Sequence, residues 1–110
     1  MAGKTKEQQE KEFWEKWKVK IFNLFKNKQK REEQEKSELE SYIQYIYEFT
    51  EIHGVRETAR RLEDSGRKTN PTAISQIRNG ITEDYGFDYI ASLAEAISNL
   101  GIGINEKISD

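Results

Sequence analysis

The chain has 110 residues, of which 35% are charged, and it carries a net charge of -2. That length accommodates one small domain and an appendage. The chain has no Cys and a single His, His53, which excludes disulfides, thiolate metal sites, His-based catalytic triads and multi-His metal sites. No apolar run approaches the length of a membrane span, and no apolar signal segment follows the first residues. We therefore expect a cytoplasmic protein with no cofactor and no metal.

The charges are distributed unevenly along the chain. Residues 1–38 hold eleven Lys/Arg and eight Asp/Glu, whereas residues 39–110 hold seven and twelve. Within the acidic part, residues 54–80 carry six basic side chains against three acidic ones. A basic island in an acidic domain suggests contact with a polyanion, although charge alone favours ordinary solvated helix faces.

The first predicted helix spans residues 13–28. Residues 1–11 have no apolar pattern, and we expect them to be frayed. The polar residues 26–36 are expected to form a helical connector, which their propensity favours, or a flexible linker. On a helical wheel, six large apolar side chains of this helix share one face: Phe13, Trp14, Trp17, Ile21, Leu24 and Phe25.

Two more helices are predicted next. Ser37–Glu40 matches a Ser-x-x-Glu capping box and precedes an apolar run, and Gly54 is a natural stop for the helix that follows. After Gly54, the next predicted helix spans residues 55–63, with Ala59 and Leu62 facing inward. The polar segment 64–69 that follows contains a glycine and predicts a loop.

The stretch 70–80 is predicted to be a short, sharply delimited helix. Asn70 can cap it, Pro71 suits its first turn, and Gly80 can end it. Ile74 and Ile77 form its inward stripe. A last helix is expected to be capped at residue 82 or 84 and to end at residues 101–103, leaving a tail over 105–110.

These helices carry a family resemblance. Val55–Leu62 resembles the second helix of Cro/phage-repressor-type (Xre-like) regulators, with the small Ala59 where two helices cross. Pro71–Gly80 resembles the recognition helix of that family, and Leu100–Ile102 resembles its closing element. The resemblance covers about residues 38–104. In one departure, the turn is about five residues longer than in the family, with Ser65–Thr69 as the expected extra material.

The resemblance implies an all-α fold: a helix-turn-helix domain of four to five helices at residues 37–104, preceded by an amphipathic helix and connector at residues 1–36. It also implies that the start of the helix at 70–80 faces the major groove of DNA. Thr72 and Gln76 are then the first candidates for base contacts, and Ser75 and Asn79 could contact bases or phosphates. The expected phosphate contacts are Arg56, Arg67, Lys68 and Arg78. For Arg60 and Arg61, pairing with nearby acids is an equal alternative.

We therefore expect a sequence-specific regulator of phage, plasmid or bacterial type that binds double-stranded DNA as a homodimer or higher homo-oligomer. The face of six apolar residues on the first helix is the expected oligomerisation surface, because the domain from Ser37 onward can bury its own apolar faces. A fold-back of this face onto the domain is left open. The alternative function is an antitoxin or adaptor whose N-terminal helix holds a partner protein. A membrane-surface role is least favoured, and no catalytic constellation is present to suggest an enzyme.

Overall fold

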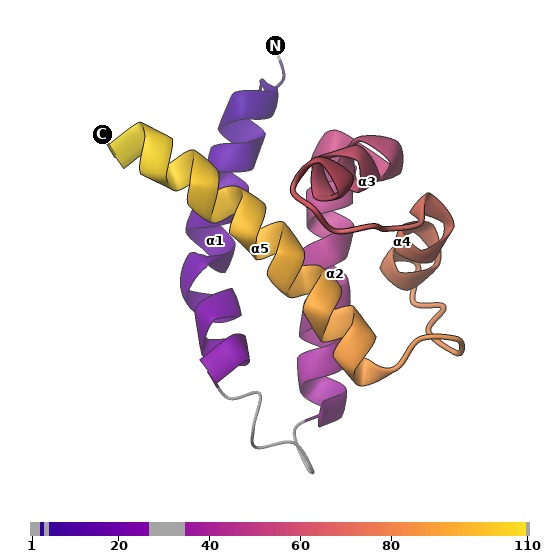
Figure 1. Ribbon diagram of the computed structural model, residues 1–110. Coiled ribbons are helices and arrows are strands. Elements are labelled where there is room, and N and C mark those ends of the chain that lie inside the picture. The colour runs from indigo at the N-terminus through magenta and orange to yellow at the C-terminus, as the bar shows by residue number, and fades with distance from the viewer. Residues whose placement is uncertain (1–2, 4, 27–34, 110) are drawn as a thin grey trace.

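The fold is an assembly of five α-helices, seen in a computed structural model that describes residues 3, 5–26 and 35–109. The helices are α1 (Lys6–Lys26), α2 (Glu35–His53), α3 (Val55–Asp64), α4 (Pro71–Arg78) and α5 (Phe87–Ser109), and the described ranges contain no strand (Figure 1). The all-α prediction is confirmed. Most of the connector predicted at residues 26–36 lies outside the described residues.

The helix α1 begins earlier than the apolar pattern predicted. Thr5 and Gln8 form a reciprocal cap: the backbone N–H of Gln8 donates to Thr5 Oγ1 at 3.2 Å, and the N–H of Thr5 donates to Gln8 Oε1 at 3.1 Å. This pairing satisfies two N–H groups that a helix start leaves unpaired. Residues 6–11 are therefore helical, and the expectation that they are frayed is wrong.

The helix α2 is the centre of the fold, and it contacts each of the other four helices. It begins two residues before Ser37, so the predicted capping box lies inside the helix, where the hydroxyl of Ser41 donates to the carbonyl of Ser37 at 3.2 Å. On its apolar side, Tyr42, Tyr45, Ile46 and Phe49 are fully buried. The stop at Gly54 is confirmed: this glycine has φ 84°, a left-handed conformation that L side chains rarely adopt.

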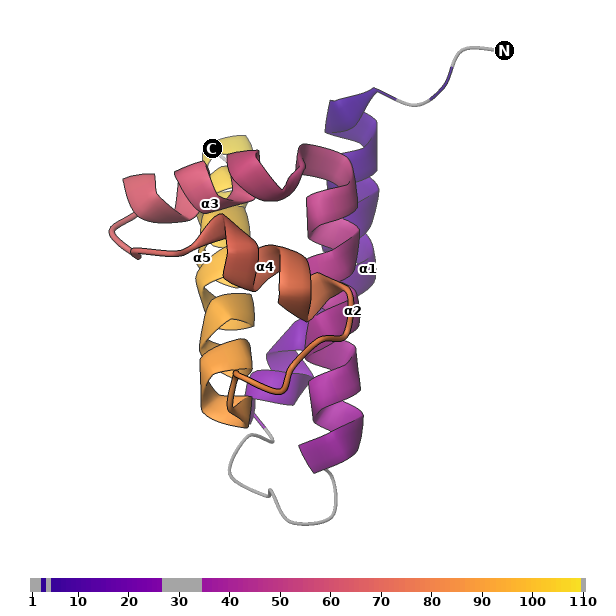
Figure 2. The same cartoon turned by 90° about the vertical axis from the view of Figure 1, so that its right-hand side faces the viewer.

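The helix α1 lies alongside α2 and shares one hydrophobic core with it (Figures 1 and 2). The ring centres of Phe13 and Tyr45 are 5.1 Å apart, and those of Phe13 and Phe49 are 5.6 Å apart. Trp17 meets Tyr45 edge-on at 5.2 Å. The prediction that α1 belongs to a segment separate from the compact domain is therefore wrong, because the aromatic rings of α1 and α2 pack in the same core.

The helix α5 crosses α2 and also contacts α1 and α3. It begins at Phe87, a few residues after the predicted caps, because residues 82–85 form a turn with the N–H of Tyr85 donating to the carbonyl of Thr82 at 3.1 Å. The helix continues through Gly101 and Gly103 to Ser109, so the predicted end and the tail at 105–110 are wrong. Glycine disfavours a helix interior by only about 1 kcal/mol, which continued backbone hydrogen bonding can offset.

Candidate nucleic-acid interface

The helix α4 is delimited by capping residues at both of its ends. Asn70 is its N-cap, with the side-chain oxygen accepting from the N–H of Thr72 at 2.9 Å, and Pro71 occupies the first turn. At the other end, Gly80 has φ 82°, and the N–H of Ile81 donates to the carbonyl of Gln76 at 2.8 Å. These features confirm the predicted helix and fix its length.

The inner face of α4 packs against α2 and α3. Ile74 and Ile77 are fully buried, as predicted, and Ala73 is buried beside them. From α3, the small side chain of Ala59 and the fully buried Leu62 belong to the same core. The two helices are joined by the segment 65–70, which runs over the surface (Figure 2). The two helices α3 and α4 and the loop between them therefore pack on one shared hydrophobic core.

The outer face of α4 is polar. Thr72 and Asn79 are exposed, and Ser75 and Gln76 are half-buried. Thr72 and Gln76 lie four residues apart, so they share one side of the helix. The hydroxyl and amide groups predicted to read DNA are therefore brought together on a single helix whose other side is fixed in the core.

Two tyrosines connect α4 to α5. The hydroxyl of Tyr85 donates to Oε1 of Gln76 at 2.5 Å, and the ring of Tyr85 stacks on that of Tyr89 at 5.4 Å between centres. Neither tyrosine was identified from the sequence. Tyr85 lies in the turn beyond α4, and no local pattern links it to Gln76, so only the packed structure could show this contact.

Arg78, predicted to contact a phosphate, is engaged by side chains of the protein. Its Nε donates to Thr50 Oγ1 at 2.7 Å, its Nη2 pairs with Glu51 at 2.5 Å, and its side chain is only 16% exposed. All of these partners are on α2. This guanidinium ties α4 to α2, and its predicted role as a phosphate contact stays a prediction.

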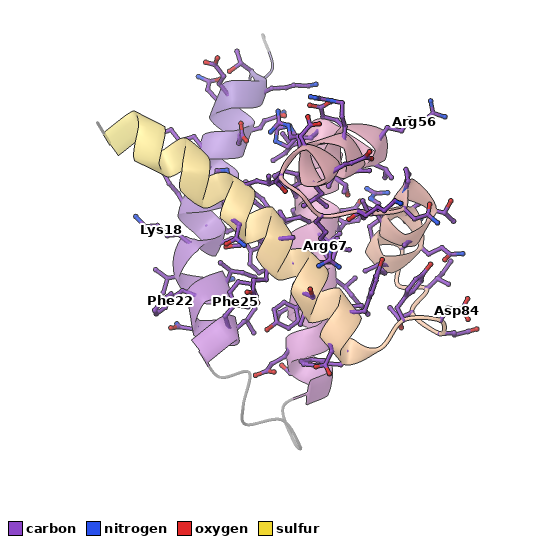
Figure 3. All side chains as sticks on the ribbon, viewed as in Figure 1. Lys18, Phe22, Phe25, Arg56, Arg67 and Asp84 are labelled. Atoms are coloured by element: carbon purple, nitrogen blue, oxygen red, sulfur yellow. The ribbon has the colours of Figure 1, made fainter. Side chains whose placement is uncertain are left out.

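Arg67 also faces the protein rather than the loop tip. Its Nη1 donates to the hydroxyl of Ser92 at 2.6 Å, and its guanidinium lies 5.6 Å from the ring centre of Tyr89 on α5 (Figure 3). Lys68, next to it, is exposed. The segment Ser65–Thr69 is at the surface as predicted, but Arg67 turns toward α5 and anchors it. Its contact with a phosphate stays a prediction.

The arginines of α3 differ in their surroundings. Arg60 pairs with Glu57 at 2.6 Å and with Asp64 at 2.9 Å, and Arg61 pairs with Glu57 at 3.0 Å. Hydrogen bonds from Arg60 and Arg61 lower the pKa of Glu57 to about 2. Arg56 instead is exposed and projects away from the protein (Figure 3). Among the described residues of the basic island, Arg56, Arg67 and Lys68 have no acidic partner, and of these Arg56 and Lys68 are exposed.

The face predicted for oligomerisation is occupied within the chain. Phe13, Trp14, Trp17 and Ile21 are each at most 7% exposed, and Leu24 and Phe25 are partly buried against the same core. The exposed apolar residues of α1 are Val19 and Phe22, each 64% exposed. The expectation that the domain from Ser37 onward buries its own apolar faces is therefore wrong, because α2 and α5 leave an apolar surface that α1 covers.

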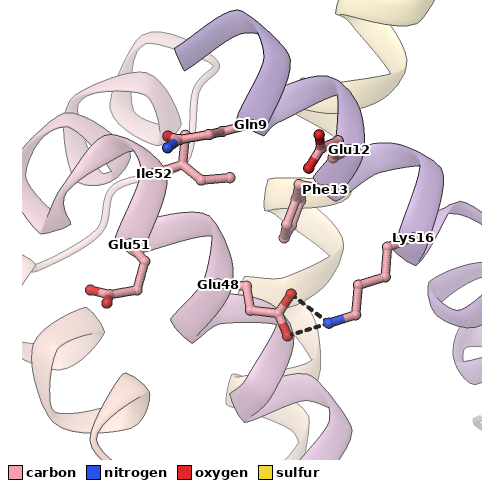
Figure 4. Close-up of a pocket in the computed structure, with 7 residues that line it drawn as sticks. All are labelled: Gln9, Glu12, Phe13, Lys16, Glu48, Glu51 and Ile52. Carbon is pink, nitrogen blue, oxygen red and sulfur yellow. Dashed lines mark hydrogen bonds and ion pairs between the residues drawn. The ribbon is translucent and has the colours of Figure 1, made fainter. Parts of the chain in front are cut away.

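Polar contacts reinforce this position of α1. Glu48 of α2 accepts two bonds of 2.9 Å from Lys16 Nζ and one of 3.1 Å from the indole N–H of Trp17, beside a groove lined by Phe13 and Ile52 (Figure 4). Burial raises the pKa of Glu48, but hydrogen bonds from Gln44, Lys16 and Trp17 outweigh it, so its pKa lies below the usual value. The charged carboxylate is the form these donors favour.

His53 lies where α1, α2 and α3 meet. Its side chain is 3% exposed, and its Nε2 is 3.3 Å from Glu10 of α1, whose carboxylate is also 3.5 Å from Arg61 of α3. Burial, followed by the positive charge of Arg61, lowers the pKa of His53 below its ordinary value. The imidazole is therefore neutral at neutral pH. Over the described residues, His, Asp and Glu form no cluster of three that could hold a metal ion.

Taken together, the fold and this surface define a small all-α protein with a polar helix, α4, mounted on a rigid core. No family model matches the chain, and neither a curated protein nor a solved structure matches it. In the described part of the chain, each helix is too short or too polar to cross a membrane.

Proposed function

We propose that this protein is a sequence-specific, double-stranded DNA-binding transcriptional regulator that inserts α4 into the major groove. The observation that carries the proposal is the outer face of α4, where Thr72 and Gln76 stand on a helix fixed by its caps and its buried side, with Asn79 at its C-cap. An α-helix fits the major groove, and hydroxyl and amide groups read base edges there. Figure 1 shows α4 at the edge of the molecule, on the side of α2 opposite α1.

The proposed contacts divide into base readers and phosphate contacts. Thr72 and Gln76 are assigned to bases, and Ser75 and Asn79 to bases or phosphates, as the resemblance implies. Arg56 and Lys68 supply the phosphate contacts, since both are exposed. Two cations per copy give a shallow salt dependence, with a slope of about -2 in log K against log salt.

So few phosphate contacts support binding by more than one copy. A two-fold dimer on a palindromic site doubles the contacts and raises the expected slope to about -4. We therefore keep the homodimer in the proposal, although the buried face of α1 cannot be its interface while it occupies the core. The antitoxin or adaptor alternative rested on that same face, and no other observation favours it.

The direct test is selection from a random duplex pool at low salt, followed by anisotropy titrations of the selected and scrambled duplexes. We expect a shared sequence motif and preferential binding of the selected duplex. Gln76→Ala should cost about 1–3 kcal/mol on the selected site and relax specificity at one base pair. Gln9→Ala, at an exposed position on α1, is the matched control and should leave binding unchanged. The absence of DNA binding at low salt would refute the proposal.

A further inference from the structure

The hydrogen bond between Tyr85 and Gln76 determines which groups Gln76 can offer to a base. A glutamine amide has one oxygen, which can accept two hydrogen bonds, and one NH₂ group, which can donate two. In this structure the tyrosine hydroxyl donates to that oxygen at 2.5 Å, at the short end of such bonds. Over the described residues, the side-chain hydrogen bond of Gln76 is the one at its oxygen, so its NH₂ group remains to donate.

The tyrosine that holds Gln76 is itself held. Its ring stacks on Tyr89 with an angle of 26° between the planes, and the guanidinium of Arg67 lies over the other tyrosine. Arg67 is in turn bonded to Ser92 of α5 at 2.6 Å. This series of contacts runs from the loop before α4 to the turn after it. It restricts where the Tyr85 hydroxyl can move, and therefore how the Gln76 amide can rotate.

Adenine and guanine need different hydrogen-bonding groups from such an amide. In the major groove, adenine presents an N7 acceptor and an N6 donor, so its two-bond contact with glutamine needs both the oxygen and the NH₂. Guanine presents two acceptors, N7 and O6, and needs donors only. An adenine N6 would have to use the second lone pair of the oxygen that Tyr85 already engages, whereas a guanine contact does not use this oxygen.

We infer that Tyr85 is a specificity-determining residue, which presents Gln76 to DNA as a hydrogen-bond donor and makes it select guanine over adenine. This inference rests on the proposed DNA binding through α4. It goes further by naming the base class that Gln76 reads and the residue that sets the choice. Tyr85 acts through Gln76 and is thus a positioning residue rather than a base contact.

The test compares Tyr85→Phe with Tyr89→Phe. Both keep an aromatic ring for the stack, but only Tyr85→Phe removes the hydroxyl bonded to Gln76. The base pair read by Gln76 is first identified as the position where Gln76→Ala loses its preference. Affinities for duplexes carrying guanine or adenine at that position are then measured for the wild type and both variants, together with the salt slope and the melting temperature.

We expect the wild type and Tyr89→Phe to prefer guanine by about tenfold, the ratio that one well-placed base contact provides. In Tyr85→Phe the ratio should fall to near one or reverse, with the salt slope unchanged. A wild-type preference for adenine, or the same ratio in Tyr85→Phe, would overturn the inference and leave DNA binding standing. A Tyr85→Phe variant that loses affinity equally for both duplexes while melting earlier would show a merely structural role, and would also overturn it. Failure of the wild type to bind any duplex would remove the proposed function and the inference together.

Discussion

The guanidinium of Arg78 lies 4.6 Å from the ring centre of Tyr47, on the neighbouring α2. The same guanidinium donates to Thr50 and pairs with Glu51. These three contacts, at Tyr47, Thr50 and Glu51, therefore join the C-terminal end of α4 to little more than one turn of α2. A side chain at the end of a DNA-reading helix would ordinarily be assigned to a phosphate, and here its partners assign it to the protein.

We predict that Arg78→Ala destabilises the fold by about 1–3 kcal/mol, because it removes hydrogen bonds to a hydroxyl and a carboxylate that are made by a largely buried charge. Urea unfolding measures this change. Arg56→Ala is the matched control: its side chain is exposed, so stability should stay within about 0.5 kcal/mol. Equal stability of the two variants would show that the tether to α2 contributes nothing.

In DNA binding we expect the reverse: Arg56→Ala should have the larger effect and Arg78→Ala the smaller. Arg56→Ala should reduce the salt slope by about 1 and weaken all sequences similarly, since it removes a phosphate contact. Arg78→Ala should leave the slope unchanged once the protein is folded, because its charge is neutralised by Glu51. Titrations of both variants at several salt concentrations check this, and a reduced slope for Arg78→Ala alone would restore Arg78 as the phosphate contact.

A substitution pair on α1 tests whether its aromatic face belongs to the core of one chain. Trp17→Ala should cost about 3–5 kcal/mol, because it removes a ring that is 4% exposed and a donor to Glu48. Val19→Ala, two residues away at 64% exposure, should stay within about 0.5 kcal/mol. Urea unfolding at two protein concentrations separates the two cases. A loss for Trp17→Ala that depends on concentration would indicate packing between copies instead.

His53 predicts a pH dependence of stability below neutrality. In the unfolded chain this His takes up a proton near pH 6.5, whereas in the fold its lowered pKa delays protonation to lower pH. The unfolded state thus binds more protons as the pH falls through 6.5, so the free energy of unfolding should decrease from pH 7.5 to 5.5. Glu48 and Glu57 do not contribute in this window, because their lowered pKa values place their titration in more acidic solution.

Stability measured across that window for the wild type and for His53→Asn checks this prediction. The variant has no imidazole to protonate, so its stability should vary less with pH, even though its absolute stability is lower. An identical pH slope for the two proteins would place the pH dependence elsewhere.

A substitution pair in the loop between α3 and α4 tests which side chain anchors it. Arg67→Ala should destabilise the fold by about 1 kcal/mol, because it removes the bond to Ser92 and the contact with the Tyr89 ring. The neighbouring Lys68→Ala should have little effect on stability and should weaken DNA binding at low salt. Thermal melts of the two variants rank them, and the reverse order would mean that Lys68 rather than Arg67 anchors the loop.

Much of the local structure was determined by the sequence alone. Asn70, Pro71 and Gly80 mark the ends of α4, and the inward stripe of Ile74 and Ile77 was correctly assigned. Gly54 separates α2 from α3 as predicted. The Thr5–Gln8 cap was also present as a sequence signal, in a stretch that has no apolar pattern. These features depend on backbone groups within a few residues of one another, and for that reason a reader of the sequence can find them.

The tertiary structure alone decided which surfaces and charges remain available. The apolar face of α1 looks the same on a helical wheel whether it packs on α2, on a second copy or on a partner, because burial depends on the shape of what lies opposite. Likewise the charge of Arg67 or Arg78 does not reveal whether its partner is a phosphate or a side chain of the same protein, since Ser92 and Glu51 are brought near only by folding. The polar side of α4 was thus predictable from periodicity, whereas the hydrogen bond of Tyr85 to Gln76 joins groups whose separation is set by packing.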